Sequence, residues 1–426
     1  METQPPTGDS ITGVYGLKIN EEVFRVYSIK NIMKNRFLRC FKRLTGVLFL
    51  AFSACSTPPP TDNGYTVAAF YWPAYHYEPR AEFLFPDKKG EWEIIYNAIP
   101  KEAGHQQPKV PLWGYPDEAD SADMDQKITE AVKYGVNTFI FDWYWYEGQP
   151  FLEDCINEGF LKANNNRMKF YLMWANHDAT TYWDVDNPRI DSVIWKGGVD
   201  REQFNVVTDR IISKYFSDPS YFKINGEPVF CIYELNTLIN GLGGAEQTRA
   251  ALDDFKRKTR DAGFPGLHLQ GILWGALPST IEGVPGDTIQ SQNEVLTWFG
   301  FKSMTNYCWA HLQNPDGDYE TWADKSTAMW ENFSKEFTVP YLPNVTISWD
   351  ANPRFLFKAG YITNSTPEKF AGYLRNAKAH VDAHPGIPKI ITINAWNEWS
   401  EGSYLEPDTL WKYGYLEAVK EVMNGR

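Results

Sequence analysis

The sequence predicts a single catalytic domain folded as a (β/α)8 barrel, in which eight parallel strands alternate with helices. Two observations support this prediction. From Tyr65 onward, short apolar runs alternate with longer amphipathic segments, which is the pattern of βα units. Nearly every apolar run also ends in an aromatic or polar residue, as expected where strand ends build a site. The predicted strands are Thr66–Trp72, Val136–Trp143, Lys169–Trp174, Pro228–Glu234, Leu267–Trp274, Phe299–Asn306, Tyr341–Trp349 and Lys389–Trp396.

The segments between these runs have the amphipathic spacing of helices. The predicted helices are Ser121–Lys133, Arg201–Tyr215, Glu246–Asp261, Thr321–Phe337, Pro367–Val381 and Leu410–Met423. Two long stretches, Pro73–Asp120 and Asp178–Asp200, remain as loops that follow strands. Loops of that kind usually carry the contacts to substrate.

The N-terminal segment differs from the rest of the chain. From Met33 a run of basic residues is followed by a run of apolar residues and then by small residues up to Ala54, directly before Cys55. This order is typical of a secretory signal peptide of the bacterial lipoprotein type, and it is too short for a membrane-spanning helix. We interpret residues 1–54 as an upstream extension plus signal peptide, with translation starting at Met33. The alternative is a buried apolar segment of the domain.

Under this interpretation, Cys55 is the lipidation site and residues 55–64, which are rich in proline and polar residues, form a tether. Residues 65–426 are then the catalytic domain. We expect an exported bacterial lipoprotein, located in the periplasm or on the outer-membrane surface.

The acidic composition limits the class of partner. The formal net charge of −13 disfavours nucleic acid and anionic membranes, whereas neutral glycans remain acceptable. We therefore expect membrane contact only through the lipid anchor, and a monomer. The 17 Trp and 24 Tyr suit stacking against sugar rings, although core packing must account for many of them.

Motifs for metals and cofactors are missing from the sequence. There is no HExxH or CxxC motif and the seven histidines are scattered, so we expect no protein-bound zinc. No phosphate-binding GK[ST] loop and no GxSxG motif is present, which argues against a nucleotide cofactor and a serine esterase. Beyond Cys55, the three remaining cysteines, Cys155, Cys231 and Cys308, do not form a disulfide framework.

The strongest chemical signal is Ile390–Glu401, IITINAWNEWSE, in which an apolar strand leads to two carboxylates. If Glu398 opens a helical turn, Glu401 lies on the same face, about 5 to 6 Å away between Cβ atoms. Retaining glycosidases hold their two carboxyl groups about 5 to 5.5 Å apart. One acid can then protonate a leaving oxygen while the other supplies or generates the nucleophile. We predict that Glu398 and Glu401 are catalytic; the alternative is a solvated loop with two ordinary acids.

Aromatic and polar residues near the strand ends are predicted to bind the sugar, by stacking or by hydrogen bonding. They are Tyr71, Trp72, Trp113, Asp142, Trp143, Tyr144, Trp174, Asn176, His177, Tyr233, Glu234, Trp274, Trp349, Asp350, Asn397 and Trp399. Some alternatives remain open. Asp142 could instead cap the next helix, and His177 could be structural. Asp350 could pair with Arg354, and Glu234 is the next candidate acid.

With these motifs in view, the chain resembles the WbsX-type family and, more distantly, the endo-acting α-mannosidases and α-mannanases of glycoside hydrolase family 99. The likeness covers most of 65–424 and rests on AFYWPAYH, QPKVPLWGYPDEAD, FIFDWYWYEGQPFLED, LMWANHD, SWDANPR and NAWNEWSEGSYLEPD. The resemblance implies a (β/α)8 barrel. The family 99 motif is NEWHEG, with both glutamates catalytic, and this chain departs from it at Ser400, which replaces the histidine. That departure concerns the bound sugar and endo-action more than it concerns the acid pair.

The resemblance also implies a role for each acid. Glu398 would take the proton from the sugar 2-hydroxyl, so that its oxygen displaces the aglycone through a 1,2-anhydro sugar. Glu401 would protonate the departing oxygen and then activate water, with retention of configuration. We therefore expect a lipid-anchored glycoside hydrolase that cleaves an oligo- or polysaccharide of the α-mannoside-like class. The alternatives are a WbsX-type glycosyltransferase of polysaccharide biosynthesis and a non-catalytic glycan-binding lipoprotein.

Overall fold

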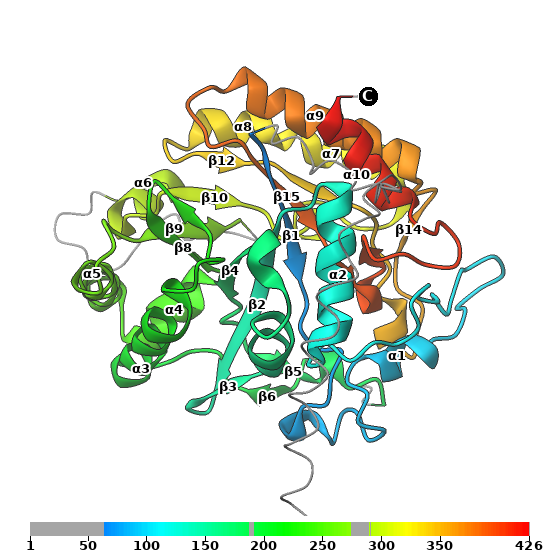
Figure 1. Ribbon diagram of the computed structural model, residues 1–426, viewed down its shortest axis with the longest axis horizontal. Helices are drawn as coiled ribbons and strands as arrows, with labels where there is room; N and C mark the ends of the chain where they lie inside the picture. Colours follow the sequence, from blue (N-terminus) through cyan, green and yellow to red (C-terminus); the bar gives the residue numbers. More distant parts are fainter. Residues whose placement is uncertain (1–63, 187–190, 274–288, 290, 426) are drawn as a thin grey trace, which may run out of the picture. The chain divides into compact units, whose positions relative to one another are not determined.

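A computed structural model describes residues 64–186, 191–273, 289 and 291–425 (Figure 1). The predicted signal peptide, Cys55, most of the tether and Trp274 lie outside the described residues. Among the residues described, no helix has the length and apolar content needed to cross a membrane.

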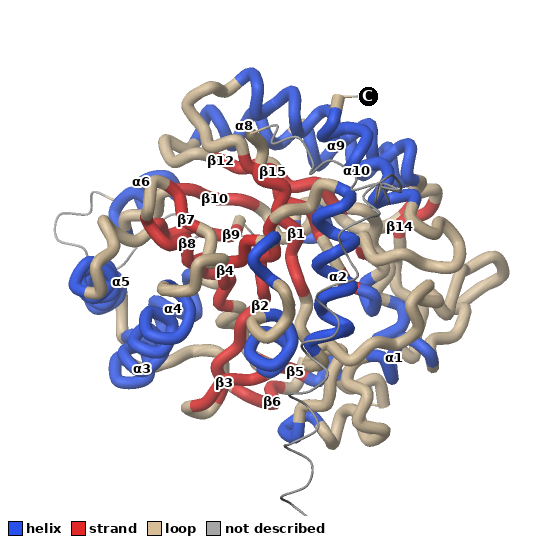
Figure 2. Tube along the Cα trace, in the orientation of Figure 1, coloured by secondary structure: helices blue, strands red, loops and turns tan. Residues whose placement is uncertain are grey.

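The chain forms the predicted (β/α)8 barrel. Its parallel strands are β1 (Thr66–Tyr71), β2 (Thr138–Tyr146), β4 (Lys169–Trp174), β8 (Glu227–Ile232), β9 (His268–Ile272), β10 (Ser303–Thr305), β12 (Tyr341–Leu342), β13 (Asn344–Thr346) and β15 (Ile390–Asn394). Hydrogen bonding orders them β12-β10-β9-β8-β4-β2-β1-β15-β13. Figure 2 shows these strands at the centre, with helices around them. Each of the eight predicted strands is therefore present.

The barrel is closed by one interrupted strand. β12 and β13 follow one another, separated only by Pro343, and together they match the predicted seventh strand. β12 pairs with β10 through Met304 and Tyr341, whereas β13 pairs with β15 through Asn344 and Thr392. Because the two halves pair with opposite ends of the strand order, the sheet forms a ring.

Helices cover the outside of this ring. They are α1 (Trp92–Tyr96), α2 (Ser121–Tyr134), α3 (Arg201–Ile211), α4 (Leu235–Leu242), α5 (Ala245–Asp261), α6 (Gln292–Phe299), α7 (Tyr319–Thr327), α8 (Met329–Glu336), α9 (Pro367–Ala383) and α10 (Gly414–Asn424). The predicted helix 321–337 is two helices, α7 and α8, which meet at Ala328. The predicted helix 410–423 starts only at Gly414, because Lys412 has a φ of 52°, in the left-handed region that helices exclude.

Short pieces of structure extend the strand ends. β3 (Gln149–Phe151) and β7 (Lys223–Ile224) add hairpins to β2 and β8. The pairs β5 (Ala179–Thr180) with β6 (Val193–Trp195), β11 (Gly317–Asp318) with β14 (Ile362–Thr363), and β16 (Asn397–Glu398) with β17 (Ser403–Tyr404) lie in loops. Single turns of 3-10 or π-helix span Pro79–Ala81, Cys155–Phe160, Asn165–Arg167, Thr181–Trp183, Ile212–Phe216, Trp309–His311, Asn352–Arg354 and Trp399–Glu401.

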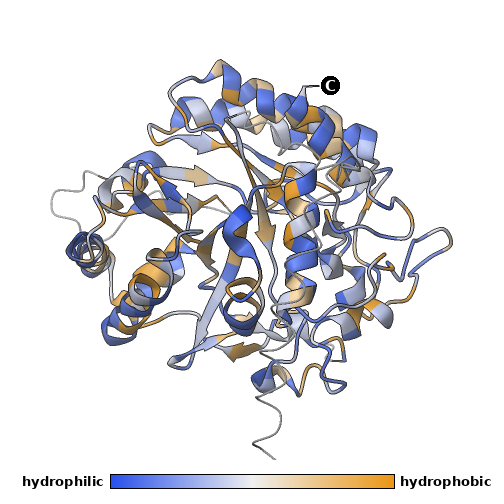
Figure 3. Ribbon diagram, viewed as in Figure 1, coloured by the Kyte–Doolittle hydropathy of each residue, from blue (hydrophilic) through white to orange (hydrophobic). Residues whose placement is uncertain are grey.

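The core of the barrel is mainly apolar and tightly covered. Residues 67–71 of β1 are buried, and this strand is mostly hydrophobic in Figure 3. Some polar side chains inside the ring are paired: the Thr305 and Thr392 hydroxyls lie 2.8 Å apart, and Asn344 donates to Thr392 at 3.1 Å. Cys155, Cys231 and Cys308 are free and buried.

Candidate active site

The predicted acids lie on one small hairpin that follows β15. Glu398 ends β16, and Trp399–Glu401 forms a single 3-10 turn before β17. Side chains three residues apart eclipse one another in such a turn, so Glu398 and Glu401 face the same side. Gly402 ends the turn with a φ of 65°, and a Cβ at this position would lie 2.9 Å from that of Asp350. Glycine is therefore required where the hairpin passes Asp350.

Both acids open into one cavity of about 440 Å³ at the C-terminal end of the strands. This volume lies within the range of about 300 to 1,000 Å³ that is usual for ligand pockets. Its walls combine aromatic rings with acids, imidazoles and one guanidinium. The lining residues are Trp72, Asp142, Tyr144, Met173, Ala175, His177, Asp178, Thr180, Tyr182, Trp183, Tyr233, Glu234, Tyr307, His311, Trp349, Arg354, Glu398 and Glu401.

Glu401 lies near a phenol and a cation. Its carboxylate accepts a hydrogen bond from the Tyr182 hydroxyl at 3.3 Å, and Arg354 Nε lies 3.9 Å away. Burial raises the pKa of Glu401 to about 7, although Arg354 acts against this rise. A carboxyl group with such a pKa can give and take a proton near neutral pH.

Glu398 lies in a different environment, next to a phenol that it shares with Asp142. The Tyr307 hydroxyl makes a short hydrogen bond with Glu398 Oε1 and lies 2.8 Å from Asp142 Oδ2. Burial and the neighbouring Glu401 raise the pKa of Glu398 well above its usual range. Burial also raises the pKa of Asp142 well above its usual range. The second oxygen of each carboxyl group has no hydrogen-bond partner among the described residues.

A buried ion pair supports the wall behind Glu401. Arg354 Nη1 lies 2.6 Å from Glu91 Oε1, and both side chains are about 1% exposed. The other oxygen of Glu91 accepts hydrogen bonds from Trp72 Nε1 at 2.5 Å and from the Ser400 hydroxyl at 3.0 Å. Ser400 therefore points away from the cavity and fixes the acid that holds Arg354.

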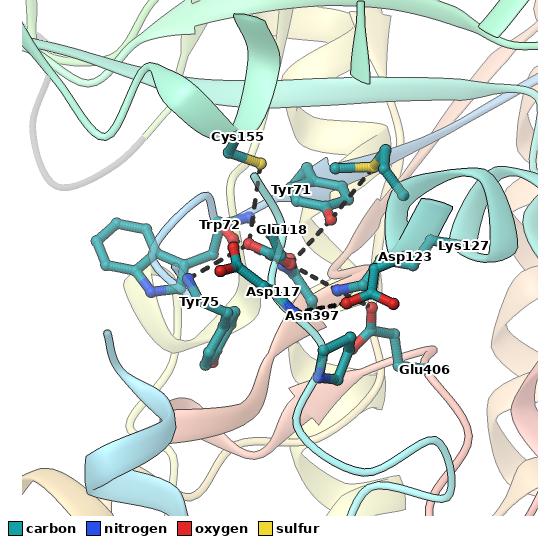
Figure 4. Close-up of polar contacts among 12 residues, drawn as sticks. Tyr71, Trp72, Tyr75, Asp117, Glu118, Asp123, Lys127, Cys155, Asn397 and Glu406 are labelled. Atoms are coloured by element: carbon teal, nitrogen blue, oxygen red, sulfur yellow. Dashed lines mark hydrogen bonds and ion pairs between the residues drawn. The ribbon is translucent and has the colours of Figure 1, made fainter. Parts of the chain in front are cut away.

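A second buried network holds the residues on either side of Glu398 (Figure 4). Lys127 Nζ on α2 lies 2.6 Å from Glu118 and 2.7 Å from Glu406, and all three side chains are nearly or fully buried. Although burial opposes it, the two carboxylates raise the pKa of Lys127, so its charge is retained.

Each of these carboxylates holds one neighbour of Glu398. Asn397 Nδ2 donates to Glu118 at 2.7 Å, and Trp399 Nε1 donates to Glu406 at 2.7 Å. Asn397 also hydrogen-bonds the backbone N–H and C=O of Trp72, at 2.8 and 2.7 Å. Lys127 thus fixes the hairpin of β16 and β17, which carries Glu398 and Glu401, from behind, without contacting the cavity.

The structure brings nine of the predicted site residues to the cavity, on six of the eight strand ends or the loops that follow them. They are Trp72, Asp142, Tyr144, His177, Tyr233, Glu234, Trp349, Glu398 and Glu401. Glu234 also accepts a hydrogen bond from Thr237 at 2.6 Å, at the start of α4.

The other predicted residues that the structure describes do not line the cavity. Tyr71, Asn397 and Trp399 join the Lys127 network or its carboxylates, and Asn176 hydrogen-bonds the backbone of Glu234. Trp143 Nε1 donates to Glu153, Trp174 is fully buried, and Trp113 Nε1 donates to Tyr413.

Asp350 does not pair with Arg354, the alternative raised by their spacing. It accepts hydrogen bonds from Asn352 at 2.9 Å, His105 at 2.9 Å and Gln107 at 2.7 Å, and against the effect of burial these bonds lower its pKa. Arg354 pairs instead with Glu91. The loop that contains His105 therefore supports the segment after β13 and does not line this cavity.

The sequence did not single out several residues that prove central. Tyr182, Trp183 and His311 lie in single 3-10 turns within loops, where no periodicity indicates their direction. Arg354, in another such turn, was considered only as a partner of Asp350. Tyr307 follows the sixth strand and could have been ranked higher on that ground.

The groups that could bind a metal, within the described residues, are limited to one cluster outside the cavity, between α8 and α9.

An aromatic cavity with two buried carboxyl groups, at the C-terminal end of a (β/α)8 barrel, is typical of carbohydrate-active proteins. The family model described as "Glycosyltransferase WbsX" matches residues 67–419. The chain therefore belongs to the WbsX glycosyltransferase family.

Curated relatives include the uncharacterized protein WxcX from two strains of Xanthomonas campestris pv. campestris. Each is 26% identical over 362 residues, which is 84% of this chain and 49% of the relative. The chain thus spans about half the length of these relatives.

Solved structures share the fold. The GH99 endo-alpha-mannosidase from Bacteroides thetaiotaomicron superposes with a TM-score of 0.55 at 13% identity, covering 85% of this chain and 97% of the other. A glycoside hydrolase-like protein gives a TM-score of 0.53 at 16% identity, covering 84% and 94% of the two chains. At these identities the likeness establishes the barrel, not the reaction.

We predict that Lys127→Met lowers the free energy of unfolding by about 3 to 5 kcal/mol, because two buried carboxylates lose their shared cation. Denaturant unfolding of the two proteins measures this difference. Lys133→Met is the matched control, since Lys133 lies on the same helix in an exposed pair with Glu130 at 2.8 Å. The control should cost at most about 1 kcal/mol. Equal losses in the two variants would contradict the role given to Lys127.

Proposed function

We propose that this chain is a glycoside hydrolase that cleaves a glycan of the α-mannoside-like class with retention of configuration. The observation that carries the proposal is the pair of buried carboxyl groups, Glu398 and Glu401, on one turn and in one aromatic cavity. Their surroundings differ, because Glu401 faces Arg354 and Tyr182 whereas Glu398 faces Tyr307. Different surroundings are what an acid and a base need.

In the first half of the proposed reaction, Glu398 accepts the proton of the sugar 2-hydroxyl. The freed oxygen attacks C1 from the face opposite the aglycone, and the bond from C1 to the aglycone oxygen breaks. Glu401 gives its proton to that departing oxygen. The products are a 1,2-anhydro sugar, a neutral Glu398 and an ionised Glu401, which the adjacent Arg354 stabilises.

In the second half, water enters where the aglycone left. Glu401 takes a proton from this water, whose oxygen attacks C1 and opens the three-membered ring. The 2-oxygen recovers its proton from Glu398. Both acids return to their starting states, and two inversions at C1 give net retention.

Glu398 must be ionised before the first step, although burial raises its pKa. The Tyr307 hydroxyl has one proton and two carboxyl neighbours, so a second proton is needed for both hydrogen bonds. We place this second proton on Asp142, which then donates to the Tyr307 oxygen while Tyr307 donates to Glu398. That arrangement leaves Glu398 Oε2, which has no partner among the described residues, facing the sugar.

Replacing either acid tests the assignment. We predict that Glu398→Gln and Glu401→Gln each lower kcat by about 10²- to 10⁴-fold, because general acid–base catalysis contributes about that much. The thermal transition should change little, since both residues project into a cavity. Turnover is measured on a panel of α-mannans, host glycans and plant polysaccharides. Glu246→Gln, at an exposed position on α5, is the control; wild-type rates in both active-site variants would reject the proposal.

The pH dependence follows from the pKa of Glu401. The free enzyme needs this group protonated, and its pKa is raised to about 7. We therefore predict that kcat/KM falls about tenfold per pH unit above about pH 7, and that it also falls at lower pH as Glu398, which must be ionised, takes up a proton. A pH–rate profile on an active substrate measures both limbs. A profile that rises across pH 7 to 9 would show that Glu401 is not the acid.

The family description favours a second candidate, a glycosyltransferase. The two activities differ in the acceptor of the sugar, which is water in hydrolysis and a hydroxyl group in transfer. Digestion in ¹⁸O-labelled water, followed by mass spectrometry of the reducing end, separates them. Label at C1 of the released sugar supports the hydrolase. Sugar transfer from a nucleotide-sugar donor, with no cleavage of any glycan, would favour the transferase.

Glycan binding without turnover would point to the third candidate, a binding protein. Its signature is an affinity for glycans that survives both Glu→Gln changes while the wild-type protein cleaves nothing in the panel. The cavity aromatics alone would then carry the function.

We also propose that the protein is exported and attached to a lipid through Cys55. The support is the basic, apolar and small-residue order of residues 33–55. Mass spectrometry of the mature N-terminus tests this. A diacylated or triacylated Cys55 is the expected result, and an unmodified chain that retains Met1 would refute it.

A further inference from the structure

A cluster of metal-ligand side chains lies between α8 and α9, away from the cavity. It contains Glu331, His380 and His384, and one ligand atom from each lies within 4.8 Å of the other two. None of the three lines the candidate active site. Although the seven histidines form no metal-binding motif in the sequence, His380 and His384 are four residues apart. That spacing places two side chains on one face of a helix.

His384 is held with one ring nitrogen free to bind. It caps the C-terminus of α9, and its Nδ1 lies 2.8 Å from the His380 carbonyl oxygen. A carbonyl group only accepts, so Nδ1 carries the proton and Nε2 keeps its lone pair. Metal-binding histidines usually have this arrangement, in which a backbone carbonyl fixes the tautomer.

His380 is buried and has partners on both ring nitrogens. Its Nδ1 lies 3.3 Å from Glu331 Oε1, and its Nε2 lies 3.2 Å from the Ser334 hydroxyl. The serine hydroxyl can donate or accept, so it supports either neutral tautomer. When Nε2 donates to Ser334, Nδ1 has a lone pair directed toward Glu331. The Trp330 ring, with its centroid 5.7 Å from that of His380, keeps the imidazole in place.

We propose that Glu331, His380 and His384 form a binding site for one divalent transition-metal ion, with Zn²⁺ as the best match. Two imidazoles and a carboxylate suit zinc, whereas Ca²⁺ and Mg²⁺ prefer oxygen ligands alone. Bonds of about 2.0 to 2.2 Å require the three donor atoms to approach more closely than 4.8 Å. The Glu331 side chain is 56% exposed, so it has the freedom to move inward. A water molecule completes four ligands.

The position of this site assigns it a structural role. Glu331 belongs to α8, and the two histidines end α9, just before β15 begins at Ile390. The site therefore lies toward the N-terminal ends of the strands, whereas the cavity lies at their C-terminal ends. The bound ion would tie α8 to α9 and stabilise the fold without touching the reacting groups.

Zinc titration of the protein tests the proposal. The full domain, purified without a histidine tag and freed of metal with a chelator, is titrated with ZnCl₂ by calorimetry and by thermal unfolding. We expect one Zn²⁺ per chain, and a thermal transition that rises with zinc concentration. His384→Ala and Glu331→Gln should each weaken zinc binding about tenfold or more, since each removes one of three protein ligands.

The controls separate this site from surface binding and from misfolding. Glu336→Gln removes an exposed carboxylate from the same helix, α8, and should bind zinc like the wild type. The metal-free transition of Glu331→Gln should match that of the metal-free wild type, because this side chain is exposed. That of His384→Ala should lie slightly lower, because the variant loses the hydrogen bond to the His380 carbonyl, so its zinc response is compared with its own metal-free transition. No saturable binding, or binding that both ligand variants retain unchanged, would overturn the proposal. Hydrolysis assays play no part in this test, so its outcome is independent of the proposed reaction.

Discussion

The active site depends on the burial of one lysine. Lys127 is fully enclosed between Glu118 and Glu406, and an enclosed charge persists only when its partners offset the loss of water. The same two carboxylates hold Asn397 and Trp399, the residues on either side of Glu398. The contacts that neutralise the lysine therefore also orient the hairpin that carries Glu398 and Glu401. The polar side chains that orient Glu398 and Glu401 are themselves buried outside the cavity.

Most of the fold could be predicted from the sequence, because the alternation of apolar runs with amphipathic segments repeats the βα unit. All eight strands were found in this way. Helices α1, α4 and α6 were not predicted, and other errors occurred where local chain geometry interrupts a periodic pattern. Ala328 separates two helices that share one continuous amphipathic pattern, and Lys412 delays the start of α10. Neither interruption changes the pattern of apolar and polar residues, so neither could be predicted from that pattern.

The candidate site was predictable only in part. Residues at or just beyond the end of a predicted strand, such as Asp142, His177 and Glu398, were correctly predicted to line the cavity, because the strand ends of a barrel converge. Position along the strand could not tell which way a side chain points, so Trp143 and Trp174 were included although both are buried behind the wall. Arg354 was matched with the wrong acid, because its true partner, Glu91, lies far away in the sequence. Long-range pairing of charges is decided by the fold and not by local spacing.

The interrupted strand 341–346 has a consequence for solubility. By pairing with β10 on one side and β15 on the other, it leaves the described ring without an open edge. An open edge would offer unpaired N–H and C=O groups to a second molecule and so promote aggregation. Aromatic residues make up 16% of this chain, a proportion that would favour such self-association. Circular strand pairing thus leaves fewer backbone groups through which a chain so rich in aromatic rings could aggregate.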